Sequence, residues 1–369
     1  MSKVKIGFVG VGDISGIYLK NITGMFKEIE VIGVCDLVRE KAERAVKKYN
    51  IPKLYNDMYE LFADDEVDIV LNITRPYEHF EVTKAALEAG KHVYSEKPLA
   101  STFEKGTILK NLAKEKGLYL GGAPDTFLGA GIQTCRKLIE EGFIGQPVGA
   151  AAHMICHGHE TWHPDPEFYY KHGGGPMMDM GPYYITALVN LLGPVSSVAG
   201  MTKISFPTRT ITSEPKHGTV IDVEVPTYVT GIMQFENGAI GTITTTFDVY
   251  PGEYEYIEIY GSEGTLLVPD PNGFGSSGIK VIRPGSKEGE PVELEFNYSE
   301  NSRALGLADM AKAIQTGRKH RANSDLTYHV LEVMTSFERS SNEKKQIKLE
   351  STFERTPLMF ADLPEGILD

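Results

Sequence analysis

Apolar runs and helical repeats alternate through the first third of the chain. Five short apolar runs are typical of strands buried on both faces, and they lie at residues 4–10, 30–36, 67–74, 91–95 and 118–122. The stretches between them carry apolar residues at helical spacing, and they cover residues 13–26, 38–50, 78–90 and 101–117. This alternation predicts right-handed β-α-β units on a doubly wound parallel sheet, a Rossmann-type α/β domain.

The pattern changes after Gly121-Gly122-Ala123-Pro124, where we place a domain boundary between residues 1–123 and 124–369. Alternating apolar positions on both sides of Asn237-Gly238 predict a β-hairpin over residues 228–247. Further expected elements are helices at 131–141, 185–192, 303–317 and 326–339, strands at 150–157 and within 254–268, and surface loops at 269–278 and 283–291. The second domain is therefore predicted to be α+β with a mostly antiparallel open sheet.

Charge and cysteine usage narrow the classes of function. The chain has 37 basic and 50 acidic residues and a net charge of −13, without a basic block that could follow phosphates. We therefore expect no nucleic-acid or membrane partner. The three cysteines are few and far apart, and the N-terminal apolar run is too short for a signal peptide, so we expect a cytoplasmic protein.

The first strand ends in a glycine-rich turn, Gly10-Val11-Gly12-Asp13-Ile14-Ser15-Gly16. Glycines let a backbone approach a pyrophosphate, and the following helix N-terminus attracts its charge. We therefore expect Gly10, Gly12, Asp13 and Ile14 to contact a dinucleotide, with Asp36 on a ribose hydroxyl. Asp36 would repel a 2′-phosphate, which favours NAD, although Arg39 keeps NADP open. The alternative is an ordinary glycine-rich turn with a surface aspartate.

Two further strand ends face the same crevice of such a sheet. At the first, Thr74, Arg75 and His79 are candidate cofactor contacts, or else parts of a helix-entry turn with a structural histidine. At the second, a strand ends in Glu96-Lys97-Pro98. A lysine there can exchange a proton with a substrate hydroxyl if its pKa falls from about 10.4 toward neutrality. An ordinary surface lysine is the alternative.

Together these features resemble the Gfo/Idh/MocA oxidoreductases, over nearly the whole chain. The features are the G-x-G turn, the acid after the second strand, the turn at residues 72–79 and the Glu96-Lys97-Pro98 tripeptide. The resemblance implies a nicotinamide-dependent dehydrogenase or reductase acting on sugars, sugar derivatives or cyclitols. It makes Lys97 the catalytic lysine and places Glu96 and Lys97 beside the cofactor.

The family's second motif, D-x-G-x-H, is altered here. Asp179 matches the aspartate, but Tyr183 occupies the histidine position. The i,i+4 spacing predicts both side chains on one helix face, where we expect them to be catalytic and to bind substrate. A phenol exchanges protons less readily than an imidazole at neutral pH. Tyr183 is therefore tuned, or only binds substrate, or leaves proton transfer to Lys97, or is replaced by another histidine; a core aromatic is the structural alternative.

Five histidines crowd the stretch from residue 153 to residue 172. We expect Glu160-Thr161-Trp162-His163-Pro164 to form a substrate wall, with Trp162 stacking on a sugar and His163, and less directly His159, contacting it. Zinc ligation by this group is a weaker alternative, and we expect no metal. Arg303 is either a site contact or part of a solvated helix face.

The sequence thus predicts reversible hydride transfer between NAD and a secondary alcohol of a sugar, glycoside or cyclitol. Two alternatives remain open: redox-assisted elimination or epimerisation with a retained NAD, and a cofactor-sensing regulator without catalysis. Apolar and threonine residues on the hairpin strands predict a homodimer or homotetramer through the open sheet.

Overall fold

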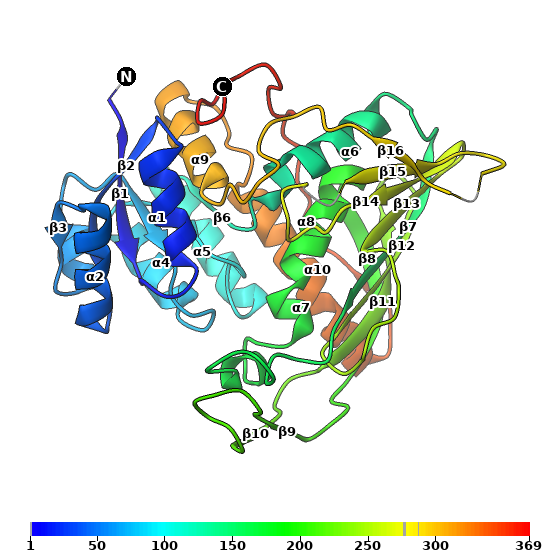
Figure 1. The fold of residues 1–369 in the computed structure, drawn as a ribbon, viewed down its shortest axis with the longest axis horizontal. Coiled ribbons are helices and arrows are strands. Elements are labelled where there is room, and N and C mark those ends of the chain that lie inside the picture. The colour runs from blue at the N-terminus through cyan, green and yellow to red at the C-terminus, as the bar shows by residue number, and fades with distance from the viewer. Residues whose placement is uncertain (1, 276–277, 287) are drawn as a thin grey trace.

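Two sheets organise the computed structural model of the chain, which describes residues 2–275, 278–286 and 288–369 (Figure 1). The N-terminal sheet is six-stranded and parallel, in the order β3-β2-β1-β4-β5-β6. Its strands are β1 (Val4–Val9), β2 (Ile29–Cys35), β3 (Lys53–Leu54), β4 (Ile69–Asn72), β5 (His92–Ser95) and β6 (Leu120–Gly122). The strand order reverses between β1 and β4, and such a switch point opens a crevice at the carboxyl ends of the strands.

The expected Rossmann-type domain is confirmed, with small shifts of boundary. Its helices are α1 (Ser15–Gly24), α2 (Arg39–Tyr49), α3 (Met58–Ala63), α4 (His79–Glu88) and α5 (Phe103–Lys116). Helix α5 begins where the Thr102 side chain accepts a hydrogen bond from the Lys105 N–H, and it ends at Gly117 in the left-handed region. The sequence prediction missed β3 and α3.

The second sheet is nine-stranded and mostly antiparallel, as expected, in the order β16-β15-β14-β13-β7-β12-β11-β8-β17, with β7 and β12 parallel. Its strands are β7 (Pro147–Ile155), β8 (Val195–Lys203), β11 (Tyr228–Phe235), β12 (Ile240–Thr246), β13 (Ile257–Gly261), β14 (Gly264–Val268), β15 (Ile279–Ile282), β16 (Glu290–Val292) and β17 (Ile347–Lys348). The predicted hairpin is confirmed, with Tyr228 opposite Thr246. A separate pair, β9 (Thr208–Thr210) and β10 (Val220–Asp222), lies within the connection between β8 and β11.

Helices cover one face of this second sheet and lie between the two sheets (Figure 1). The helical elements are η1 (Thr126–Leu128), α6 (Ala130–Glu140), η2 (Glu167–Tyr170), α7 (Pro176–Asp179), α8 (Gly181–Leu192), α9 (Leu305–Thr316) and α10 (Ser324–Glu343). Helix α8 is buried along its whole length, and α10 packs on β8. Among the described residues, no helix is long and apolar enough to cross a membrane.

The segment expected as a surface loop at 269–278 is partly buried. Phe274 is in the core, and its carbonyl accepts a hydrogen bond from the Gly131 N–H at 3.0 Å. That bond draws the segment onto the start of α6, so the prediction of an exposed loop is wrong for Phe274. Residues 276–277 and 287 of the two expected loops lie outside the described residues.

The C-terminal part of the chain returns to the first domain. The Asn21 amide in α1 donates to the carbonyls of Asn301 and Arg303, both at 2.9 Å. The Gly122 N–H donates to the Ala322 carbonyl at 3.1 Å, and Figure 1 shows α9 on the side of the N-terminal domain. The boundary at residue 123 stays a prediction, and residues 301–322 contact the domain before it.

Candidate active site

The turn after β1 leaves open space at the N-terminus of α1. Gly10 has φ +92°, and a Cβ there would lie 2.7 Å from the Ile73 carbonyl oxygen. A Cβ on Gly12 would meet no atom within 4 Å. The first glycine is therefore required by the fold, whereas the second leaves room for a group that approaches the helix N-terminus. These residues fit a dinucleotide pyrophosphate.

Asp36 lies beside this turn with its carboxylate fixed. One oxygen accepts a hydrogen bond from the Val11 N–H at 2.6 Å, and the other accepts one from the Val38 N–H at 2.7 Å. A carboxylate has further lone pairs, and Asp36 is partly exposed, so it can still accept ribose hydroxyls. Arg39, which keeps NADP open, donates to Glu43 and Asn56. Asp13 and Ile14 are exposed on the same turn.

The turn after β4 is tied to the lysine turn by His79. The ring nitrogens of this buried histidine lie 2.8 Å from the Pro98 carbonyl oxygen and 3.0 Å from the Thr74 carbonyl oxygen. Both nitrogens therefore face protein atoms, which leaves the imidazole a positioning role rather than a free nitrogen for a cofactor. The Thr74 hydroxyl donates to Asn72 at 2.7 Å.

Glu96 and Lys97 leave the end of β5 in different directions. The buried Glu96 carboxylate accepts a hydrogen bond from the Tyr18 hydroxyl at 2.7 Å and one from the Lys97 N–H at 3.0 Å. The Lys97 ammonium donates to Asp179 Oδ1 at 2.9 Å and to the Asp179 carbonyl at 2.7 Å. The strand that ends in a charged pair thus connects the N-terminal sheet to α7.

The Lys97–Asp179 pair carries full charges in this arrangement. Burial lowers the pKa of Lys97, but Asp179, Tyr183 and Glu96 together outweigh it and hold that pKa above its usual range. For Asp179, burial opposes ionisation, while Lys97 and His159 bring its pKa down to about 2. The lowered Lys97 pKa that proton exchange requires is not found without a cofactor, because a carboxylate rather than a cation lies beside the ammonium.

The sequence spacing predicts Asp179 and Tyr183 on one helix. The structure places them on two, because the helix is interrupted at Met180. Asp179 ends α7, and Tyr183 lies in the first turn of α8. They nevertheless meet at Lys97, whose ammonium is 5.1 Å from the centre of the Tyr183 ring. Burial raises the pKa of Tyr183 against the charges of Lys97 and Arg303. The phenol therefore stays neutral and can donate a hydrogen bond.

Arg303 reaches this group from the far end of the chain. It precedes α9, and its guanidinium donates to the Asn272 side chain at 2.8 Å and lies 6.0 Å from the Phe274 ring centre. The idea of a solvated helix face is wrong for this residue, since its charge acts on Tyr183 and on the buried Asp125. Burial raises the pKa of Asp125 to about 6.

Residues 157–175, which we call the cover segment, line part of the pocket beside Lys97. The His159 ring lies 4.2 Å from Tyr169 and 4.6 Å from Phe247, between ring centres. Trp162 is 61% exposed, so it is available at the rim rather than packed in the core. The His163 Nδ1 accepts a hydrogen bond from the Asp165 N–H at 3.0 Å. Burial lowers the pKa of His163, against the charge of Asp13 on the dinucleotide turn.

Glu160 is expected in the substrate wall, but it is buried and fixes the cover segment to the rest of the domain. Its buried carboxylate accepts hydrogen bonds from Tyr170 and, at 2.9 Å, from Arg209. Arg209 also pairs with the buried Asp248 at 2.7 Å. Removing one partner of such a buried pair costs about 3–5 kcal/mol, which fixes the segment in place. His157, another histidine of this stretch, stacks on Tyr250 with 3.8 Å between ring centres.

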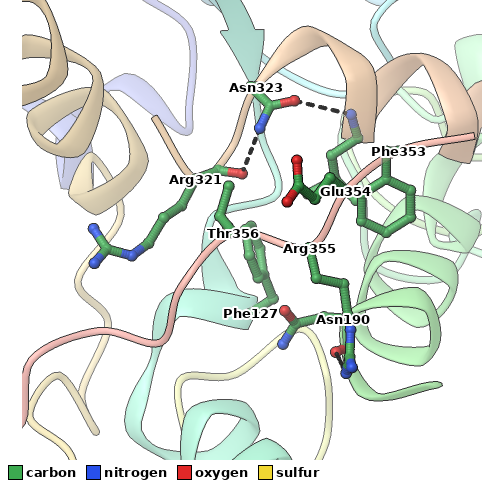
Figure 2. A pocket seen from close by; sticks show the side chains of 9 residues that line it. Phe127, Asn190, Arg321, Asn323, Phe353, Glu354, Arg355 and Thr356 are labelled. Carbon is green, nitrogen blue, oxygen red and sulfur yellow. Dashed lines mark hydrogen bonds between the residues drawn. The ribbon is translucent and has the colours of Figure 1, made fainter. Parts of the chain in front are cut away.

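Two pockets are relevant. One opens beside Lys97, and it is lined by Pro76, Lys97, Pro98, Phe168, Tyr169, Gly173, Gly174, Met178 and Asp179. The other lies where the segment 353–356 passes α8 and the start of α10 (Figure 2). There Asn323 caps α10, and the Arg321 side chain points away to pair with Asp309. It contains none of the predicted site residues, so the candidate active site is the pocket at Lys97.

The sequence prediction missed Tyr18, Asp125 and Tyr169. Tyr18 holds Glu96, Asp125 accepts a hydrogen bond from the Gly306 N–H at 3.1 Å, and Tyr169 lines the Lys97 pocket. Tyr169 was detectable as one of several aromatic residues near the histidine cluster. Tyr18 and Asp125 gave no local signal, since each acts on a residue far away in the chain.

Family models match both domains. The model of an oxidoreductase family with an NAD-binding Rossmann fold matches residues 4–122, and the model of the GFO/IDH/MocA C-terminal domain matches residues 132–267. Together they cover more than half of the chain. The first domain is therefore an NAD-binding Rossmann domain, and the chain is an oxidoreductase.

Individual relatives are distant. A myo-inositol 2-dehydrogenase of Thermotoga maritima is 22% identical over 94% of this chain and 99% of that protein. A levoglucosan dehydrogenase of Pseudarthrobacter phenanthrenivorans is 27% identical over 62% of each chain. A solved levoglucosan dehydrogenase in complex with NADH and L-sorbose has a TM-score of 0.81 at 20% identity, over 95% of this chain and 99% of that chain. At that identity, the structural match shows the shared fold.

Proposed function

Because this chain belongs to the Gfo/Idh/MocA oxidoreductase family, we propose that it transfers a hydride between NAD and a secondary alcohol of a sugar, glycoside or cyclitol. In this proposal Lys97 is the acid and base. The observation that supports it is the contact of the Lys97 ammonium with Asp179 at 2.9 Å, in a pocket at the carboxyl end of β5. The relatives carry names of inositol and levoglucosan dehydrogenases, which agrees with a polyhydroxylated substrate.

The dinucleotide would be held by groups of the N-terminal domain. Gly10 and Gly12 give the pyrophosphate access to the N-terminus of α1, and Asp36 offers its free lone pairs to the adenosine ribose. Thr74 and Arg75 line the next strand end. Bound NAD⁺ supplies the hydride acceptor and a positive charge on the nicotinamide ring.

In alcohol oxidation, the hydroxyl proton passes to the Lys97 amine while the hydride leaves the carbon that bears this hydroxyl. The groups around Lys97 hold its pKa above the usual range, so Lys97 would have to release a proton to solvent before this step. Asp179 orients the amine, and the neutral Tyr183 phenol donates a hydrogen bond to a substrate oxygen. Trp162 and His163 contact the sugar from the rim. In the reducing direction, the Lys97 ammonium returns its proton to the new alkoxide.

The test is NADH formation from NAD with a panel of sugars, glycosides and cyclitols, for the wild type and Lys97→Met. General acid–base catalysis contributes about 10²–10⁴-fold, so we expect the variant to lose turnover by that factor and to keep NADH binding. Lys105→Met, at a lysine over the Phe80 ring, is the matched control. Equal activity of both variants would contradict the proposal. Substrate consumption without net NADH would instead favour the elimination or epimerisation alternative.

We also infer that the protein self-associates through the outer face of the nine-stranded sheet. The strand register brings Met201, Ile232 and Ile240 to one face, where they are 77%, 50% and 58% exposed. Such apolar side chains favour an interface over water. Ile232→Asp should reduce the mass measured by light scattering to that of a monomer, while Tyr59→Asp on α3 should not.

The three cysteines are free, which suits a reducing compartment, and a cytoplasmic location stays a prediction.

A further inference from the structure

His159 brings a second polar group to Asp179. Its Nε2 atom lies 3.4 Å from Asp179 Oδ2, whereas Lys97 contacts Oδ1. This nitrogen is buried and has no hydrogen-bond partner within the described part of the chain. A buried ring nitrogen without a partner is unusual, and the carboxylate that holds Lys97 lies 3.4 Å from it.

We propose that His159, on the cover segment, is a positioning residue for the Asp179 carboxylate. The proposal rests on the proposed function. With a proton on Nε2 and substrate in the site, His159 would donate to Oδ2 while Lys97 keeps Oδ1, so that both carboxylate oxygens are held. The separation exceeds the usual 2.7–3.2 Å of such a bond. Contacts of this kind tighten when substrate fills a site.

The surroundings keep His159 in reach of Asp179. Its ring packs against Tyr169 and Phe247, and the next residue, Glu160, is fixed by the buried Arg209. The neighbouring histidines are otherwise engaged: His157 stacks on Tyr250, and the His163 Nδ1 accepts a backbone hydrogen bond. Among the histidines of the cover segment, His159 is the one with an ion-pair distance to Asp179.

Two substitutions separate this positioning role from ring packing. His159→Gln keeps an N–H donor and loses the ring, whereas His159→Phe keeps the ring and loses the donor. A misplaced catalytic group costs about 10²-fold in rate, so we expect kcat of His159→Phe to fall by about that factor with KM and the NADH Kd little changed. His159→Gln should recover most of this loss, and His172→Gln, at an exposed position on the same segment, should change kcat little. An active His159→Phe beside an inactive His159→Gln would overturn the proposal.

A second measurement does not require turnover, which separates this proposal from the proposed function. In protein with ¹⁵N-labelled histidine, the His159 ring resonances are assigned by their loss in His159→Gln. We expect a protonated Nε2 whose resonance shifts in Asp179→Asn and stays in place in Glu224→Gln, an exposed carboxylate in a pair with Lys171. An unchanged resonance in Asp179→Asn would overturn the positioning role, even if every sugar in the panel were rejected.

Discussion

Arg75 and Asp165 form an ion pair, with 2.9 Å between Nη2 and Oδ2, that joins the turn after β4 to the cover segment. Arg75 also lies 6.0 Å from the Phe168 ring centre, and Asp165 accepts a further hydrogen bond from Lys216. Both members of the pair are exposed, so it contributes only about 0–1 kcal/mol to folding. Its effect is to hold the cover segment over the pocket at Lys97.

Loss of this pair should therefore affect substrate binding more than stability. We expect Arg75→Gln to raise KM for the sugar, with a change in Tm of less than about 2 °C. Steady-state kinetics and thermal unfolding measure the two effects. Arg339→Gln is the matched control, because it removes a similarly exposed pair with Glu343 far from the pocket. Indistinguishable KM values for the two variants would refute a role for Arg75.

Alanine substitutions at the two glycines of the dinucleotide turn should differ in their effects on Tm and on NADH affinity. Gly10→Ala forces a Cβ to within 2.7 Å of the Ile73 carbonyl oxygen at a positive φ, so Tm should fall together with NADH affinity. Gly12→Ala meets no protein atom within 4 Å, so its Tm should match the wild type while NADH affinity falls. Fluorescence titration with NADH and thermal unfolding test both. Full NADH affinity in Gly12→Ala would contradict the expected cofactor position.

The charge of Asp179 should set the pH at which alcohol oxidation becomes fast. Lys97 accepts a proton only as the neutral amine, and Asp179 raises the Lys97 pKa, so the rate should rise with pH. In Asp179→Asn the opposite charge is gone, the Lys97 pKa falls, and the rising limb of kcat/KM moves to lower pH. The maximum rate falls as well, because the amine is less well oriented. An unmoved limb, with Glu224→Gln as control, would argue against Lys97 as the titrating base.

Buried histidines should make the fold sensitive to acid. Burial lowers the pKa of His329 to about 4, and its Nε2 accepts a hydrogen bond from the Val195 N–H. The unfolded chain binds this proton near pH 6.5, so stability is complete above that pH and is lost as the pH falls toward 4. At one pKa unit per 1.36 kcal/mol, the loss by pH 4.5 is about 2–3 kcal/mol.

Urea unfolding at pH 7 and pH 4.5 measures this loss. His329→Gln can still accept from Val195 but cannot titrate, so its free energy of unfolding should fall about 2 kcal/mol less between the two pH values than that of the wild type. His172→Gln, at an exposed position, should behave as the wild type. Equal pH dependence in all three proteins would show that His329 is not the titrating group.

Local sequence patterns were enough to identify the dinucleotide turn, Lys97 and Asp179 as candidate site residues, because each lies at a strand or helix end with a short motif around it. The same patterns gave the order of strands and helices in the first domain. They missed β3 and α3, which have two and six residues and so are too short to show a period.

Contacts between distant residues account for what remained out of reach. Nothing near Glu160 in the sequence indicates that it pairs with Arg209, and nothing near Phe274 indicates that Gly131 binds its carbonyl. The approach of His159 to Asp179 likewise depends on how the cover segment folds back. The contact between Asp179 and the Lys97 ammonium, which raises the pKa of Lys97, was also hidden in the sequence, because the two residues lie far apart along the chain.

The Asn21 amide donates hydrogen bonds to the carbonyls of Asn301 and Arg303, which are synthesised long after it. The dinucleotide turn leaves the ribosome long before the residues that cover α1 and bring a guanidinium toward Tyr183. An unfinished polypeptide can thus expose a nucleotide-binding turn without a completed reaction centre. A polypeptide cut short before residue 301 would contain Lys97 and Asp179 but neither Arg303 nor the two carbonyls that bind Asn21.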